Sequence, residues 1–127
     1  MMLTPGMSQH FRASRYDAAI TSYTAALSAM ATPDSAEAAS CYNNRAACYS
    51  QIGAHHEVVS DAGRVLAIEA NNLKALIRRG LAYEALEKYS DALEDMRRAR
   101  AIDASAEVVL SACGRLPNLV RMKASLA

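Results

Sequence analysis

The sequence predicts an all-α protein built from stacked helical hairpins. The stretch Leu73–Asp103 shows the pattern most clearly, because Leu76, Gly80 and Tyr83 recur at three- and four-residue steps, as residues on one face of an α-helix do. Gly80 and Ala92 are small residues on the apolar faces of two successive helices. Small residues at these positions let two antiparallel helices approach closely, which favours a helical hairpin.

The chain also resembles itself at an offset of 34 residues, which places Tyr49 on Tyr83. A third copy lies upstream, where the segment from Tyr16 matches the segment from Tyr89. Its offset from the second copy is longer because of an extended loop within Ala29–Ser35. Self-similarity at this period is the signature of a helical-repeat architecture.

Length and charge exclude several classes of protein. The 127 residues are enough for one domain with a single helical core. The net charge is +1 and both signs are scattered along the chain, so nothing predicts nucleic-acid binding. No apolar run reaches the length of a membrane span, and the start of the chain lacks the pattern of a signal peptide. We therefore expect a soluble, cytoplasmic protein without membrane insertion.

The side chains that often carry chemistry do not form a catalytic or metal-binding pattern. Cys41 and Cys48 are two helical turns apart, about 10 Å, too far for a disulfide, and Cys113 stands alone. His55 and His56 are adjacent, so they point in different directions on a helix, and no third ligand is spaced to join them. We expect reduced thiols, no metal, no cofactor and no enzymatic activity.

Repeat one spans about residues 3–30. A helix is expected to begin near Pro5, which the first turn tolerates. The pattern predicts a short first helix over Met7–Ala13, a turn at Ser14–Arg15 in place of a glycine turn, and a second helix over Tyr16–Met30.

Repeat two spans about residues 35–70. Asp34 or Ser35 can cap its first helix, and Gly53 is the expected C-terminal stop. The partner helix is predicted over His55–Ile68. The two helices should form a hairpin like that of the third repeat.

Repeat three spans about residues 73–104 and is capped by Asn71–Asn72. Residues 105–127 are predicted to form a final amphipathic capping helix that begins at Ser105 and is bent or interrupted at Pro117. Stacked repeats leave an apolar face uncovered at their end, and a helix with a polar outer side covers it.

The small residues, the tyrosines and the 34-residue helix-turn-helix period together resemble the tetratricopeptide repeat, over about residues 7–104. The resemblance implies that residues 1–127 are a single domain, a right-handed superhelix of three repeats with a C-terminal capping helix. It also implies a concave groove lined by the first helix of each repeat.

A more specific resemblance concerns the groove. One subset of this family grips the carboxylates of a peptide ending in Glu-Glu-Val-Asp, the tail of heat-shock chaperones. It carries a lysine and an asparagine in repeat one, an asparagine in repeat two, and a lysine and an arginine four residues apart in repeat three. Asn44, Lys74 and Arg78 match this pattern, whereas Thr4 and Ser8 stand at the repeat-one positions.

These residue types suit carboxylate binding. Lys74 and Arg78 are one helical turn apart, so both cations reach the same region, and charge-assisted hydrogen bonds contribute roughly 1.5–3 kcal/mol each. Asn44 adds a neutral donor. Ser8 can donate one hydrogen bond, but Thr4 supplies no charge, so the clamp is one cation and one amide short.

Arg45 and Arg79 occupy the same position in successive repeats. Arg79 is expected to pack its aliphatic stem between helices and to pair with an acidic neighbour. Arg79 is therefore predicted to be structural.

The functional prediction is a monomeric, non-catalytic co-chaperone adaptor whose groove takes the acidic C-terminal tail of a heat-shock chaperone. Ile77 and Leu81 would contact the aliphatic residue before the last aspartate. The alternative is a repeat scaffold that binds another protein or a second copy of itself, with the substitutions in repeat one as the sign of a degenerate clamp.

Overall fold

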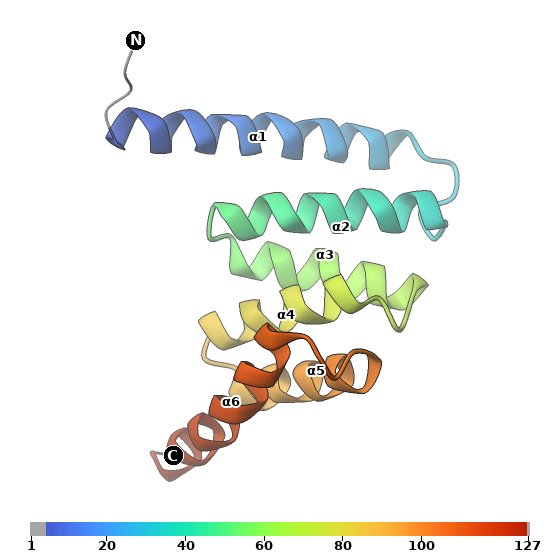
Figure 1. Ribbon diagram of the computed structural model, residues 1–127. Helices are drawn as coiled ribbons and strands as arrows, with labels where there is room; N and C mark the ends of the chain where they lie inside the picture. Colours follow the sequence, from blue (N-terminus) through green and yellow to red (C-terminus); the bar gives the residue numbers. More distant parts are fainter. Residues whose placement is uncertain (1–4, 127) are drawn as a thin grey trace.

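The computed structural model describes residues 5–126, with side chains from residue 13 onward, and its secondary structure is entirely α-helical (Figure 1). Within that range the helices are α1 (Pro5–Ala29), α2 (Ala36–Gln51), α3 (His55–Ile68), α4 (Leu73–Ala85), α5 (Tyr89–Ile102) and α6 (Glu107–Ser125). None of the described helices is both long and apolar enough to cross a bilayer.

Each helix packs on the next, so the molecule is a stack of helices with α1 at one end and α6 at the other (Figure 1). The pairs α2–α3 and α4–α5 are the two hairpins that the sequence predicts, and α2 also contacts α4 directly. The first helices of two successive repeats therefore lie side by side. This contact between α2 and α4 positions the candidate site.

Side-chain caps start two of the helices. Ser35 precedes α2, and its hydroxyl oxygen accepts a hydrogen bond from the Ala38 amide at 3.1 Å. Asn72 precedes α4 and accepts from the Ala75 amide at 3.0 Å. Both caps were predicted, because each satisfies an amide that the first helical turn cannot pair.

The turns within the two hairpins use the same backbone conformation. Gly53 has φ +73°, and Glu87, its equivalent 34 residues later, has φ +61°. Glycine adopts this left-handed region without strain, whereas glutamate does not. The expected glycine stop after α2 is confirmed.

The largest buried side chains come from α3 to α6, and most of them belong to one apolar cluster; among its members are Val65, Leu76, Met96 and Leu116. Gly80 lies against Met96: a Cβ at Gly80 would be 2.9 Å from the Met96 Cε atom. The close approach of α4 and α5 therefore depends on a small residue at this position, as predicted.

The turn predicted at Ser14–Arg15 is wrong, because α1 runs without a break from Pro5 to Ala29. No glycine or proline lies between Met7 and Met30, so nothing in this segment disfavours a continuous helix. The first helix of repeat one is therefore not folded back against the second.

The extended course of α1 leaves its inner face less covered than in the other repeats. Tyr23 and Ala26 are only half-buried, whereas Met96 and Ala99 at the equivalent positions of α5 are 0% exposed. Among residues 13–29, whose side chains are described, none is fully buried. Helix α1 is held mainly by α2.

Helix α6 is the capping helix, and it continues through Pro117 without interruption. Its N-cap is Ala106 rather than the predicted Ser105, and Ala106 makes no side-chain cap. Both the amide and the hydroxyl of Ser105 donate instead to the Asp103 carboxylate, at 2.9 and 2.6 Å. Ser105 therefore hydrogen-bonds to Asp103, the C-cap residue of α5, and does not cap α6.

Candidate functional site

Three of the residues predicted to bind a carboxylate lie on two neighbouring helices. Asn44 is exposed on α2, Lys74 is exposed on α4, and Arg78 is half-buried one turn further along α4. Ile77 and Leu81 follow on the same helix. We call the surface formed by these five residues the α2–α4 surface.

Arg78 joins the two helices. Its Nη1 atom donates to the Asn43 side-chain oxygen at 2.6 Å and to the Asn43 carbonyl oxygen at 3.4 Å. Because Asn43 directly precedes Asn44, this contact holds the Arg78 guanidinium beside the α2 turn that carries the predicted amide ligand.

Asn43 was not among the predicted site residues. Its equivalent in repeat three is Ile77, so the repeat gives no signal for a polar function at this position. Its amide nitrogen also approaches the Asn72 side-chain oxygen at 3.4 Å, and the Asn72 amide nitrogen donates to Glu69 at 2.9 Å. A line of polar side chains therefore runs from Glu69 through both asparagines to Arg78.

The α2–α4 surface carries positive charge. Within the described part of the chain, neither Lys74 nor Arg78 forms an ion pair. Partial burial lowers the pKa of Arg78, because desolvation disfavours the charged form. Burial raises the pKa of the nearby Cys48 thiol, and the charge of Arg78 opposes that rise.

Two other arginines behave differently. The Arg45 Nε and Nη2 atoms donate to Asp61, both at 2.7 Å, and the corresponding atoms of Arg79 donate to Asp95, both at 2.8 Å. The carboxylates are almost completely buried, and hydrogen bonding to them raises the pKa of each arginine. The predicted acidic pairing of Arg79 is confirmed, Arg45 pairs in the same way, and both pairs are internal.

The apolar residues of the α2–α4 surface differ in exposure. Leu81 is 38% exposed, whereas Ile77 is half-buried and packs against the apolar core. Leu81 therefore offers more free surface to a ligand than Ile77 does.

The structure does not describe the side chains of the two clamp positions in repeat one. Thr4 lies outside the described residues, and Ser8 belongs to α1 but its side chain is outside the described set. The two positions remain predictions.

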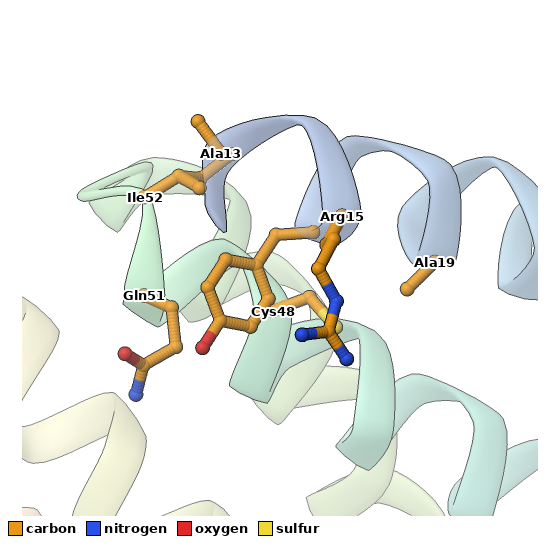
Figure 2. A pocket seen from close by; sticks show the side chains of 7 residues that line it. Ala13, Arg15, Ala19, Cys48, Gln51 and Ile52 are labelled. Atoms are coloured by element: carbon orange, nitrogen blue, oxygen red, sulfur yellow. The ribbon is translucent and has the colours of Figure 1, made fainter. Parts of the chain in front are cut away.

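A hollow of about 650 Å³ lies between α1 and α2 (Figure 2). One of its lining residues is Cys48, which is one helical turn beyond Asn44 on α2. Figure 2 shows the Arg15 side chain extending from α1 toward Cys48. The residues that line the hollow are Ala13, Arg15, Tyr16, Ala19, Cys48, Gln51 and Ile52.

Sequence comparison finds no matching family model. The chain is 32% identical over 116 residues to protein unc-45 homolog B of Danio rerio, an alignment that covers 91% of this chain and 12% of that protein. It is 38% identical over 112 residues to the mitochondrial import receptor subunit TOM34 of Rattus norvegicus, covering 86% of this chain and 36% of that protein. The chain thus spans only a small part of these relatives.

In contrast to these relatives, several solved domains match this chain over most of their own length. The TPR domain of Arabidopsis OM64 has a TM-score of 0.71 at 28% identity, with 84% of each chain covered. The TPR2B domain of yeast Sti1, in complex with an Hsp70 peptide, has a TM-score of 0.71 at 26% identity, with 87% of this chain and 90% of that chain covered. The first TPR of Spaghetti, bound to the HSP90 peptide SRMEEVD, has a TM-score of 0.76 at 24% identity, with 90% and 86% covered.

The agreement extends over nearly the whole length of the three solved domains. The 34-residue self-similarity of the sequence and the two hairpins α2–α3 and α4–α5 support the same architecture independently. This chain is therefore a helical-repeat domain with the tetratricopeptide-repeat fold.

Proposed function

We propose that the chain is a non-catalytic adaptor domain that binds the acidic C-terminal tail of a heat-shock chaperone, ending in Glu-Glu-Val-Asp, on the α2–α4 surface. One observation carries the proposal: Lys74 and Arg78 are cations one turn apart with no acidic partner among the described residues, and the exposed Asn44 follows the residue that contacts Arg78. A cytoplasmic location is part of the same proposal.

Each residue has a role in this proposal. Lys74 and Arg78 bind the two carboxylates of the terminal aspartate by charge-assisted hydrogen bonds, and Asn44 donates a neutral one. Ser8 contributes one hydrogen bond from repeat one. Leu81, and to a smaller extent Ile77, contacts the aliphatic residue before the last aspartate. Capture of a chain terminus is an established mode of peptide recognition.

The similar structures support this chemistry for their own chains. The Spaghetti domain is described with an HSP90 peptide ending in EEVD, and the second TPR of human RPAP3 with the HSP70 peptide SGPTIEEVD. The sequence of our chain is 24% and 23% identical to them, so these structures support the fold and suggest the ligand.

The test is a calorimetric titration with a Glu-Glu-Val-Asp peptide in free-acid and C-terminally amidated forms. We expect the free acid to bind more tightly, and we expect Lys74→Ala or Arg78→Ala to weaken it about tenfold, the equivalent of about 1.4 kcal/mol. Arg97→Ala is the control, because Arg97 is an exposed arginine on α5, away from the α2–α4 surface. Equal affinity for the two peptides would remove the carboxylate mechanism.

A second candidate function is a scaffold for another protein. The continuous α1 favours it, because repeat one then lacks the hairpin that would complete the groove. Salt separates the two: carboxylate capture weakens steeply with ionic strength, whereas binding through apolar surface does not.

A further inference from the structure

We propose that Asn43 is a positioning residue for Arg78: it holds the guanidinium through a neutral acceptor and so leaves the positive charge available to an anionic ligand. The inference rests on the proposed function, because it assigns a role to Arg78 in binding a carboxylate. It adds a residue that does not itself have to contact the ligand.

The first argument is the contrast among three arginines on the first helices of the repeats. Arg45 and Arg79 each donate two hydrogen bonds to one buried aspartate, so their charges are neutralised inside the molecule. Arg78 instead donates to the uncharged oxygen of Asn43, at 2.6 Å. An amide fixes the position of a cation without cancelling its charge.

The second argument is that the Asn43 amide is itself oriented. Its nitrogen faces the Asn72 oxygen at 3.4 Å, and Asn72 is fixed in turn because it caps α4 and donates to Glu69 at 2.9 Å. With the nitrogen turned to Asn72, the Asn43 oxygen faces Arg78. The amide therefore accepts from the guanidinium and does not compete with it as a donor.

The third argument concerns the donors that remain. Only Nη1 of Arg78 is used by a described residue, so Nε and Nη2 make no hydrogen bond within that part of the chain. A guanidinium anchored by one nitrogen keeps the others for a carboxylate. Preorganisation of this kind lowers the cost of ordering a long side chain on binding.

The decisive variant is Asn43→Asp, which keeps the shape of the side chain and adds a carboxylate. We expect it to pair with Arg78 and to lower the affinity for the free-acid peptide by more than tenfold, while the new ion pair compensates in part for the lost hydrogen bond to Asn72. Asn43→Ala should produce a smaller loss, because it frees Arg78 without neutralising it. Asn71→Asp is the matched control, since it makes the same charge change at an exposed residue outside the Asn43 contacts.

A purely structural role for Asn43 predicts a different result. In that case Asn43→Ala would lower the melting temperature and leave the ratio of free-acid to amidated affinity unchanged, and Asn43→Asp would bind like the wild type. Either result overturns the inference. If the wild type binds both peptides equally, the proposed function fails first, and this inference falls with it.

A ligand-free measurement checks the charge of Arg78 directly. Arg78 favours the Cys48 thiolate electrostatically, so Asn43→Asp should slow alkylation of Cys48 by iodoacetamide in a Cys41→Ser, Cys113→Ser background. An unchanged rate would show that the introduced carboxylate does not neutralise Arg78, and would overturn the inference without bearing on the peptide.

Discussion

Buried ion pairs are the most regular feature of the chain at the scale of single residues. The Arg45–Asp61 and Arg79–Asp95 pairs repeat at an offset of 34 residues, and each links the two helices of a hairpin. Because Asp61 is 3% and Asp95 is 2% exposed, neither carboxylate can exchange its arginine for water.

Asp95→Ala is therefore predicted to destabilise the fold by about 2–4 kcal/mol, since it leaves the Arg79 guanidinium without its buried partner. Arg79 keeps some contact with solvent, which places the effect below the largest values for fully buried pairs. Chemical denaturation measures the change. Glu94→Ala is the control on the same helix, because Glu94 is exposed, and it should change stability by less than about 0.5 kcal/mol.

Cys48 gives a prediction about pH. Burial raises the pKa of its thiol above the ordinary value of 9.0, so the thiol ionises at lower pH in the unfolded chain than in the folded one. The stability that Cys48 contributes is thus complete below about pH 9 and is lost as pH rises through the folded-state pKa.

The loss of unfolding free energy between about pH 8 and about pH 10 should accordingly be smaller in Cys48→Ala than in the wild type. Cys113→Ala provides a comparison at a cysteine on α6. Parallel pH profiles for the wild type and Cys48→Ala would contradict the expected burial effect.

The role of a residue could be predicted from the sequence where the same residue type recurs at the equivalent position of another repeat. The acidic pairing of Arg79 followed from its equivalence with Arg45, whereas Asn43 has an isoleucine as its equivalent and gave no such signal. The partner of Arg78 depends on the packing of α2 against α4, which the repeat period alone does not describe.

At the scale of helices and turns, the two hairpin turns have the same left-handed backbone conformation but different residues. Glu87 takes the left-handed conformation that Gly53 takes in the preceding repeat. A non-glycine residue there is strained by about 1–2 kcal/mol.

Glu87→Gly should stabilise the fold by about 0.5–1 kcal/mol, because the relief of strain exceeds the added freedom of the unfolded chain. The contact of the Lys123 ammonium with the Glu87 carbonyl oxygen uses only the backbone and should persist. Gly53→Ala is the reciprocal change and should cost about 1 kcal/mol. Thermal unfolding of the two variants measures both; a loss of stability in Glu87→Gly would contradict the argument.

Helix α1 departs most from the sequence-based prediction. Ser14 is the repeat equivalent of Gly53 and Glu87, but it lies within a continuous helix. An apolar pattern of helical period is the same whether a segment continues or folds back, so periodicity could not decide between the two. By contrast, the bounds His55–Ile68 of α3 were predicted correctly, and Ser35, Gly53 and Asn72 mark the start of α2, the turn after it and the start of α4.

For the whole molecule, the repeat period was sufficient to predict the architecture, since each hairpin of the described residues packs mainly on its neighbours in the stack. The candidate site was predicted only in part. Asn44, Lys74 and Arg78 lie on two helices in contact, but the contribution of repeat one depends on how α1 and the residues before it are arranged, and local sequence signals do not determine that arrangement.

The stack should also differ in stability along its length. Helix α1 packs mainly on α2 and has no fully buried side chain among those described, whereas α3 to α5 are flanked on both sides and contribute most of the core. In a repeat protein, the free energy of unfolding is approximately the sum of the intrinsic stabilities of the repeats and of the interfaces between neighbouring repeats. A terminal helix with one interface therefore opens most easily.

Hydrogen exchange measured by mass spectrometry should therefore show the fastest exchange in peptides from Ser14–Ala29 and the slowest in peptides from α4 and α5. The α2–α4 surface should stay ordered while α1 opens, because Arg78 joins α2 to α4 independently of α1. A free-acid tail peptide is then expected to protect amides of α2 and α4 more than those of α1, to which only the single hydrogen bond of Ser8 is assigned. If α1 were protected as strongly as α4, or gained the most protection on binding, the peptide would have to be held by repeat one, contrary to a site on the α2–α4 surface.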